Sequence, residues 1–154
     1  MIVETIGRPR HTRLCIAKRA VHFYGNYLFG QNKRLFNNVK VTVKFEKFAK
    51  DNYDFAYCDW EFDNHRSRDF IITIDCKLNK KETLLALAHE MVHVKQYVKG
   101  EMKDIFRPAR MVKWMGETID PDNTDYWELP YEIEAYGREK GLYFKFLDHI
   151  KYGE

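Results

Sequence analysis

One stretch organises this chain: Thr83-Leu-Leu-Ala-Leu-Ala-His-Glu-Met-Val-His-Val94. Apart from its first residue, its polar side chains all belong to His89, Glu90 and His93, so a helix formed by it is apolar nearly all round. Such a helix is buried, and buried imidazole and carboxylate groups are unfavourable unless they are paired or bind a metal. The stretch therefore predicts a buried helix in which something compensates all three polar groups.

The spacing of these residues indicates what compensates them. His89 and His93 lie four residues apart, so on a helix both rings can direct a nitrogen at one zinc ion about 2.0 to 2.1 Å away. Glu90 lies at the edge of the same site, where it can take a proton from a metal-activated water and pass it to a leaving amine. Because the 154 residues include six histidines, a chance match to this spacing is rare. The alternative is a buried structural pair of histidines.

The ends of two helices are visible in the sequence. Asn79, with Glu82 three residues later, resembles a capping box, and we expect the central helix to run from there to Val98, shortly before a glycine. Pro130 suits a first helical position, which predicts a last helix over residues 130–150. Both helices are long enough to present a defined face to the rest of the chain.

Upstream of the central helix, the pattern predicts one helix and three strands. Apolar residues recur at steps of three and four over residues 11–28, which is typical of an amphipathic helix. Strict alternation predicts a half-buried strand over residues 39–45. A second alternation at 56–62 and the apolar run 70–74 predict two more strands in a hairpin. Residues 101–129 contain many Gly, Pro, Asp and Asn and predict a long irregular segment, with a short hairpin around Trp114.

Length and composition are those of one folded domain over residues 1–154, with 45% hydrophobic and 32% charged residues. We expect an α+β fold with a small, mostly antiparallel sheet, an N-terminal helix, a buried active-site helix and a C-terminal helix that supplies a ligand. The three cysteines, Cys15, Cys58 and Cys76, are widely spaced and odd in number. They predict neither a disulfide framework nor a cysteine zinc site.

Charge and hydropathy give expectations about partners and location. The formal net charge of +3 does not by itself imply a nucleic-acid partner, which is therefore weakly supported. No run of about twenty apolar residues and no signal-like segment occur, so we expect a cytoplasmic protein without a membrane partner. A local basic cluster is either a solvated helix face or a phosphate-binding patch, and it comprises Arg8, Arg10, Arg13, Lys18 and Arg19.

With this motif and order of elements, the sequence resembles the zincin metallopeptidases, most closely compact SprT-like and gluzincin-type domains, over roughly residues 39–150. The resemblance implies a zincin-like single domain in which His89 and His93 bind Zn²⁺ and Glu90 is the general base. It also implies an edge strand that lines the substrate cleft. We assign residues 70–74 to that edge and expect an extended peptide to pair with them.

The third metal ligand separates these subfamilies. SprT-like proteins commonly use a third histidine, whereas gluzincins use a glutamate of a following helix, often within Glu-x-x-Ala-Asp or Glu-x-Glu-Ala. This chain has Pro-Tyr-Glu-Ile-Glu-Ala at residues 130–135, and matching the alanine selects Glu132. Glu134 lies about 200° further round the helix, so both carboxylates cannot face the same ion. Glu134 and His149 remain the alternative ligands.

The surroundings of the ligands leave alternatives open. Members of the family often have an Asp where this chain has Tyr136, so the group that orients His89 is not identified by the motif. Asp75 is either that group or a loop residue before the next helix. Tyr126 and Tyr131, like Tyr136, either polarise a scissile carbonyl or pack in the core.

The sequence thus predicts a zinc-dependent endopeptidase that acts on a peptide or protein substrate through a metal-activated water. One alternative is a SprT-like protease acting on DNA-associated proteins, which would dock through the basic residues near the N-terminus. A salt-sensitive interaction with DNA would favour it. Another alternative is a zinc-binding regulatory module without turnover. Glu90 argues against the module, because zinc retention alone does not need that carboxylate.

Overall fold

The computed structural model describes residues 1–49, 54–60, 67–105 and 110–153. Its first half contains β1 (Ile2–Ile6), α1 (Leu14–Phe29), α2 (Lys33–Asn37), β2 (Lys40–Glu46), β3 (Ala56–Trp60), β4 (Asp69–Asp75) and α3 (Lys80–Val98). The second half adds β5 (Met102–Ile105), β6 (Met111–Trp114), β7 (Glu117–Ile119), the 3-10 turn η1 (Tyr126–Glu128) and α4 (Pro130–Tyr152). Among the described residues the fold is α+β, with four α-helices and two sheets.

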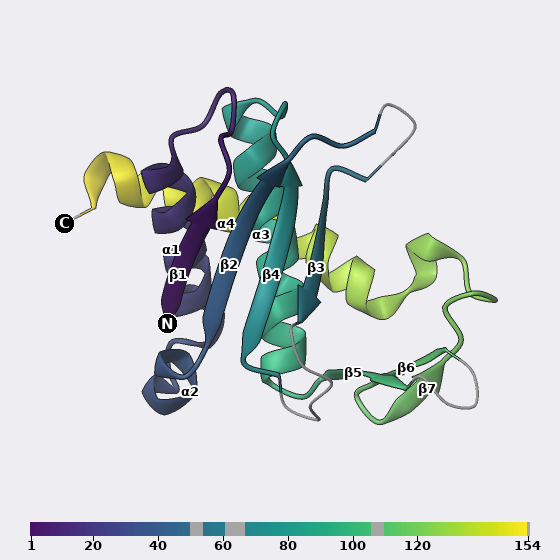
Figure 1. The fold of residues 1–154 in the computed structure, drawn as a ribbon. Helices are drawn as coiled ribbons and strands as arrows, with labels where there is room; N and C mark the ends of the chain where they lie inside the picture. The colour runs from purple at the N-terminus through teal and green to yellow at the C-terminus, as the bar shows by residue number, and fades with distance from the viewer. Residues whose placement is uncertain (50–53, 61–66, 106–109, 154) are drawn as a thin grey trace.

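The main sheet has the strand order β1-β2-β4-β3 and is mixed (Figure 1). β1 pairs parallel with β2 and β2 pairs parallel with β4, whereas β3 pairs antiparallel with β4. The expectation of a mostly antiparallel sheet is therefore wrong. The sequence pattern did not indicate a strand at residues 2–6, and the helical connection through α1 and α2 brings this strand back parallel to β2. The strand expected at 39–45 is confirmed as β2.

β4 lies inside the sheet, between β2 and β3, so the assignment of residues 70–74 to the substrate-binding edge is wrong. A continuous apolar run is typical of a strand with neighbours on both sides, and Phe70, Ile72 and Ile74 are buried. The edge strand beside α3 is β3, whose alternation leaves Tyr57 and Asp59 exposed. The expected β3–β4 hairpin is confirmed. Residues 61 and 62 of the expected strand lie outside the described residues.

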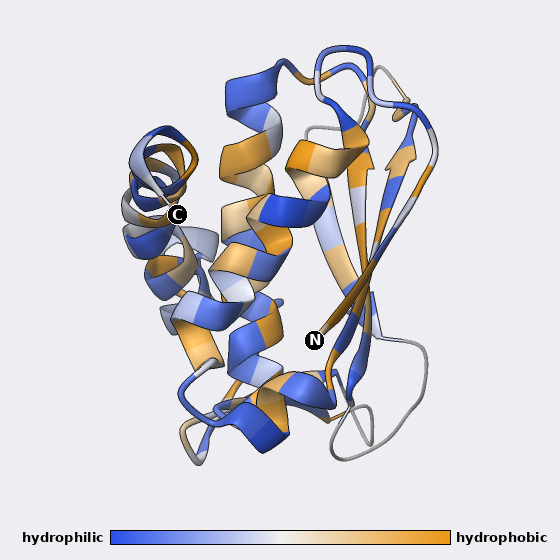
Figure 2. Ribbon diagram, turned by 90° about the vertical axis from the view of Figure 1, so that its left-hand side faces the viewer, coloured by the Kyte–Doolittle hydropathy of each residue, from blue (hydrophilic) through white to orange (hydrophobic). Residues whose placement is uncertain are grey.

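The three long helices, α1, α3 and α4, form two layers on one side of the sheet (Figure 2). α1 and α3 pack side by side against the strands, and α4 packs against the far side of α3. α3 is thus surrounded on several sides, which confirms the expectation of a buried helix. Along it Leu84, Leu87 and Met91 are fully buried, and the Tyr24 hydroxyl of α1 donates a hydrogen bond to the Leu84 carbonyl (3.2 Å). Within the described residues, none of the helices is both long and apolar enough for a bilayer-spanning segment.

Capping residues fix where α3 and α4 begin. Asn79 and Glu82 form both hydrogen bonds of the expected capping box, each 2.9 Å long, and Pro130 occupies the first turn of α4.

The segment between α3 and α4 is more regular than expected, because β5, β6 and β7 form an antiparallel sheet. The hairpin around Trp114 is confirmed, and it turns at Met115 and Gly116. This small sheet and a buried cluster beneath it lie near the start of α4.

Gly7 provides a test of this arrangement. It follows β1 with φ of 91°, and a Cβ at this position would lie 2.3 Å from the carbonyl oxygen of Phe45 in β2. Gly7→Ala should therefore lower the free energy of unfolding by at least about 2 kcal/mol, because it adds backbone strain and steric overlap. Urea unfolding measures this change.

Gly137→Ala is the matched control, because Gly137 is exposed within α4 and an added Cβ would meet no described atom within 4 Å. Alanine favours a helix interior, so this variant should be as stable as the parent or more stable by about 1 kcal/mol. A Gly7→Ala protein with parental stability would contradict the close approach of the turn after β1 to β2.

Candidate metal centre

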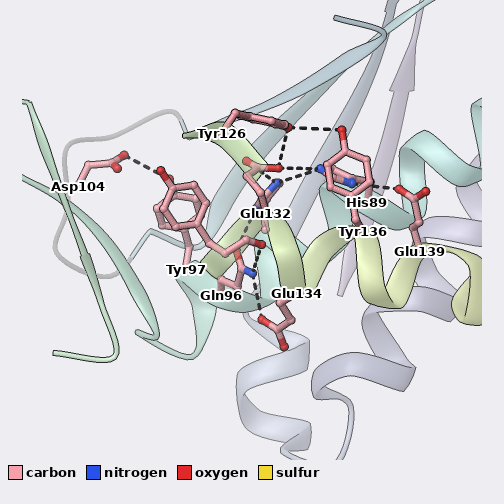
Figure 3. A network of polar contacts seen from close by, with 11 residues as sticks. His89, Gln96, Tyr97, Asp104, Tyr126, Glu132, Glu134, Tyr136 and Glu139 are labelled. Atoms are coloured by element: carbon pink, nitrogen blue, oxygen red, sulfur yellow. Dashed lines mark hydrogen bonds and ion pairs between the residues drawn. The ribbon is translucent and has the colours of Figure 1, made fainter. Parts of the chain in front are cut away.

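The packing of α4 on α3 brings three expected ligands together (Figure 3). His89 and His93 come from consecutive turns of α3, and their Nε2 atoms are 3.3 Å apart. Glu132, in the first turn of α4, places Oε2 3.3 Å from Nε2 of His89 and Oε1 3.5 Å from Nε2 of His93. Their side chains are each 11 or 12% exposed. The cluster is therefore close to fully shielded from bulk water.

The spacing of the three ligand atoms fits a tetrahedral ion. Ligands about 2.0 to 2.1 Å from a tetrahedral Zn²⁺ lie about 3.3 to 3.4 Å from one another. The separations of 3.3, 3.3 and 3.5 Å are close to this value. The three residues could therefore hold a metal ion with little rearrangement, and three protein ligands leave the fourth tetrahedral position open.

Hydrogen bonds at Nδ1 of His89 and of His93 leave Nε2 of each ring to face the cluster. Nδ1 of His89 lies 3.1 Å from Oε2 of Glu139, and Nδ1 of His93 lies 2.8 Å from Oε1 of Gln96. Both partners are acceptors, so Nδ1 carries the hydrogen and a neutral ring presents the lone pair of Nε2. Two lone pairs and the Glu132 carboxylate then face one point. With both rings neutral, these three acceptors would need a positive charge between them, which a metal ion or a proton on one Nε2 supplies.

The electrostatics of the cluster favour positive charge. Burial opposes a charged His89, but its hydrogen bonds with Glu132 and Glu139 raise its pKa to about 9. Burial likewise opposes a charged His93, yet the hydrogen bond with Glu132 leaves its pKa raised. For Glu132, burial acts to raise the pKa, but hydrogen bonds with both histidines hold it well below its ordinary value. This environment stabilises a cation, as a divalent metal site must.

Glu139 is the partner of His89 that the sequence pattern did not identify. It lies on α4 seven residues after Glu132, with Tyr136 between them at four residues, so all three share one face of the helix. This spacing was the available signal in the sequence. Asp75 is the last residue of β4, where it accepts a hydrogen bond from the backbone N–H of Lys77 (3.1 Å), so the expectation of a loop residue is also wrong.

Gln96 fixes the second histidine in the same manner. Its amide nitrogen donates to the Tyr131 carbonyl and to Oε2 of Glu134, both at 3.0 Å, so its oxygen is the atom that faces His93. The side chain is fully buried. It lies three residues after His93 on the same face of α3, where the pattern of the motif gave no reason to single it out. Both ligand rings are thus oriented by residues outside the motif.

The alternative third ligands lie away from the cluster. Glu134 accepts a hydrogen bond from Arg138 at 2.9 Å and forms an ion pair with the buried amine of Lys95. The same amine also forms an ion pair with Glu101 at 2.7 Å. His149, near the end of α4, stacks on Phe23 of α1 with ring centroids 4.8 Å apart. Neither belongs to the group of ligand atoms that lie within 4.8 Å of one another.

Two of the three tyrosines considered in the sequence face the cluster (Figure 3). The Tyr126 hydroxyl donates to Oε2 of Glu132 at 2.8 Å and lies 3.4 Å from the Tyr136 hydroxyl. The Tyr136 ring packs against His89 with centroids 4.5 Å apart. Tyr131 instead is buried beneath the small sheet, in line with the core-packing alternative.

Glu90 lies where two cavities meet. The first cavity, of about 370 Å³, extends along the N-terminal half of α3, and the second, of about 420 Å³, extends along its C-terminal half. Both are lined by His89, Glu90 and Tyr126, and both are bounded by the edge strand β3. Glu90 is 6% exposed, and burial raises its pKa although both histidines act against this. A buried carboxylate at the junction of two cavities is placed to exchange protons with a bound molecule.

Zinc binding should identify the third ligand. We expect one Zn²⁺ per chain for the parent, and a loss of affinity of at least about 100-fold for Glu132→Gln, because a direct ligand is removed. Glu134→Gln and His149→Ala should retain one Zn²⁺ per chain. Metal analysis and competition with a fluorescent chelator measure these values, with circular dichroism as the check on folding. Parental affinity in Glu132→Gln, or loss of zinc in His149→Ala alone, would contradict the cluster.

Glu139 should tune the affinity for zinc without binding the metal. Glu139→Gln retains an acceptor for His89 but no charge, so we expect about tenfold weaker binding, and about 100-fold weaker binding for Glu139→Leu. Glu128→Gln removes an exposed carboxylate of η1 and serves as the control with parental affinity. The same chelator competition applies. Equal affinities in all three variants would exclude Glu139 as the group that orients His89.

Comparisons of the chain with models of protein families, with curated proteins and with solved structures gave no match. The candidate metal centre therefore rests on the residues of this chain and on their geometry. What is shown is an α+β fold whose α3 and α4 bring His89, His93 and Glu132 to one point that could bind a metal ion.

Proposed function

We propose that the chain is a zinc-dependent endopeptidase of the zincin type, which hydrolyses peptide bonds with an activated water. The observation that carries this proposal is the place of Glu90, a buried carboxylate next to a candidate ligand and at the junction of two cavities. A structural metal site has no use for such a group. A hydrolytic site needs a base at that point.

The donor set supports zinc as the metal. Two imidazole nitrogens and one carboxylate, with a fourth position open, are a usual ligand set of catalytic Zn²⁺. Zn²⁺ held by His89, His93 and Glu132 would supply a Lewis acid for the attacking water and the scissile carbonyl. The outer hydrogen bonds from Glu139 and Gln96 keep both rings in the orientation that this requires.

The role of Glu90 is proton transfer. Its carboxylate takes the proton of the attacking water and delivers it to the nitrogen of the leaving amine. Burial raises the pKa of this carboxyl, which moves it toward the pH at which the protein works and makes both halves of the transfer efficient. The neighbouring histidines limit the rise, so the group can still lose its proton.

The position of Tyr126 beside the cluster also supports hydrolysis. Its hydroxyl lies 2.8 Å from Glu132, and its side chain lines both cavities. A hydroxyl at this point can donate a hydrogen bond to a carbonyl oxygen on which negative charge develops. Among the three tyrosines considered, Tyr126 therefore fits that role best.

The edge strand β3 supports an extended peptide as substrate. Among the described residues it pairs only with β4, so its outer backbone groups can form a ladder with an added strand. The cavities extend from Glu90 toward opposite ends of α3, so side chains on both sides of a scissile bond have space. Space for substrate residues on both sides of the scissile bond favours an endopeptidase, which cleaves within a peptide chain.

Glu90→Gln tests the proposal. The variant should keep the fold and one Zn²⁺ per chain, but its turnover should fall by at least about 10²-fold to 10⁴-fold, because the general base is lost. Cleavage of a mixed library of fluorogenic peptides by zinc-loaded protein measures this. Chelation should abolish the parental activity and added zinc should restore it.

Two results would count against the peptidase. Undiminished cleavage by Glu90→Gln would remove Glu90 from the mechanism. A parent that binds zinc but cleaves no peptide of the library would favour a metal-binding regulatory module instead.

A further inference from the structure

The first cavity is lined by carboxylates, although the chain as a whole carries a net positive charge. The described residues that line it include the carboxylates of Asp54, Glu82 and Glu139, besides Glu90, and no lysine or arginine. The second cavity is also acidic, because five carboxylates line it besides Arg110: Asp54, Asp59, Glu90, Asp104 and Glu132. Both cavities are therefore acidic in a chain with a formal charge of +3, and the first is the one whose described lining has no lysine or arginine.

The remaining walls of the first cavity are apolar or aromatic. Tyr126 and Tyr136, both partly exposed, present their rings near the metal cluster. A long cationic side chain suits such walls, because its methylene groups pack on apolar surface while its charged end meets carboxylates or the face of a ring. The apolar lining residues are Phe55, Ala56, Leu78, Leu85 and Ala86.

We propose that this first cavity is the subsite for a lysine or arginine side chain of the substrate, at a residue beside the scissile bond. The inference rests on the proposed peptidase function, because it places the scissile bond beside Glu90 and the three candidate metal ligands. The cavity adjoins that point directly, since His89 and Glu90 are part of its lining. At about 370 Å³ it has room for either side chain.

Glu82 is the carboxylate that best distinguishes the first cavity from the second. Glu139 is already engaged with His89, and Asp54 lines both cavities, whereas Glu82 lines the first cavity and not the second. Its Oε2 accepts one hydrogen bond from the backbone of Asn79, which leaves the negative charge of the carboxylate in place. A cation in the cavity is attracted and an acidic side chain is repelled.

Binding of small hydroxamates tests the cavity without requiring turnover. The probes are the Nα-acetylated hydroxamates of lysine, norleucine and glutamate, which anchor at the metal and differ in the charge of one side chain. We expect zinc-loaded protein to bind the lysine compound at least about tenfold more tightly than the norleucine compound, with glutamate weakest. Calorimetry gives the dissociation constants, and the difference should shrink at high salt.

The decisive variant combines Glu82→Gln with Asp54→Asn, and glutamine at position 82 also serves in a capping box, so the start of α3 should stay intact. The preference for lysine over norleucine should fall to less than about threefold when Glu82→Gln is combined with Asp54→Asn. Glu117→Gln removes an exposed carboxylate that lines neither cavity and should retain the full preference. An unchanged preference in the combined variant would overturn the assignment.

Cleavage of a mixed peptide library, with the products identified by mass spectrometry, separates this inference from the proposed function. Cleavage beside lysine and arginine supports both, and cleavage without such a preference overturns the subsite alone. If no peptide is cleaved but the lysine hydroxamate is preferred through Glu82, the subsite stands and the peptidase fails. Equal binding of the three hydroxamates would overturn the subsite, and no binding of any of them together with no cleavage of the library would overturn both.

Discussion

The contact between α3 and the first turns of α4 is the constraint on which the candidate site depends. α3 alone presents two ring nitrogens on one face, but the third acceptor reaches them because α4 crosses its far side. Gln96 helps to fix that crossing, because its buried amide bonds both to His93 and to the backbone of Tyr131. The group that orients a ligand thus also holds the neighbouring helix. The contacts that position the candidate metal ligands are thus the same contacts that pack the two helices.

Much of the helical part of the site could be predicted from sequence, because it depends on local periodicity. Residues four apart on a helix must share a face, which placed His89 beside His93, and a rotation of about 200° separated Glu132 from Glu134. The capping box at Asn79 and the proline that starts α4 are also local signals, and the structure contains both. Such features need no knowledge of what packs against the helix.

The sheet was harder to predict because pairing joins residues that are distant in sequence. Nothing local in residues 2–6 shows that they lie beside β2, and so neither the added strand nor the parallel pairing was foreseen. The apolar run 70–74 directly precedes α3, which favours an edge position, but its composition is that of an internal strand, and the strand order agrees with its composition. Glu139 and Gln96 were missed for a related reason. A partner of a ligand is recognised only when the position of its own helix face is known.

The buried amine of Lys95 gives the α3–α4 contact a further consequence. It forms ion pairs with Glu134 of α4 and with Glu101 just before β5, so one charge on α3 links this helix to both α4 and the start of the small sheet. A bound metal would act as a second cross-link between the same helices, about one turn away along α3. Any ion that binds the folded chain but not the unfolded chain shifts the folding equilibrium, by about 2.7 kcal/mol at a free concentration 100 times its dissociation constant. The resistance of this protein to unfolding would then rise with the concentration of free metal around it.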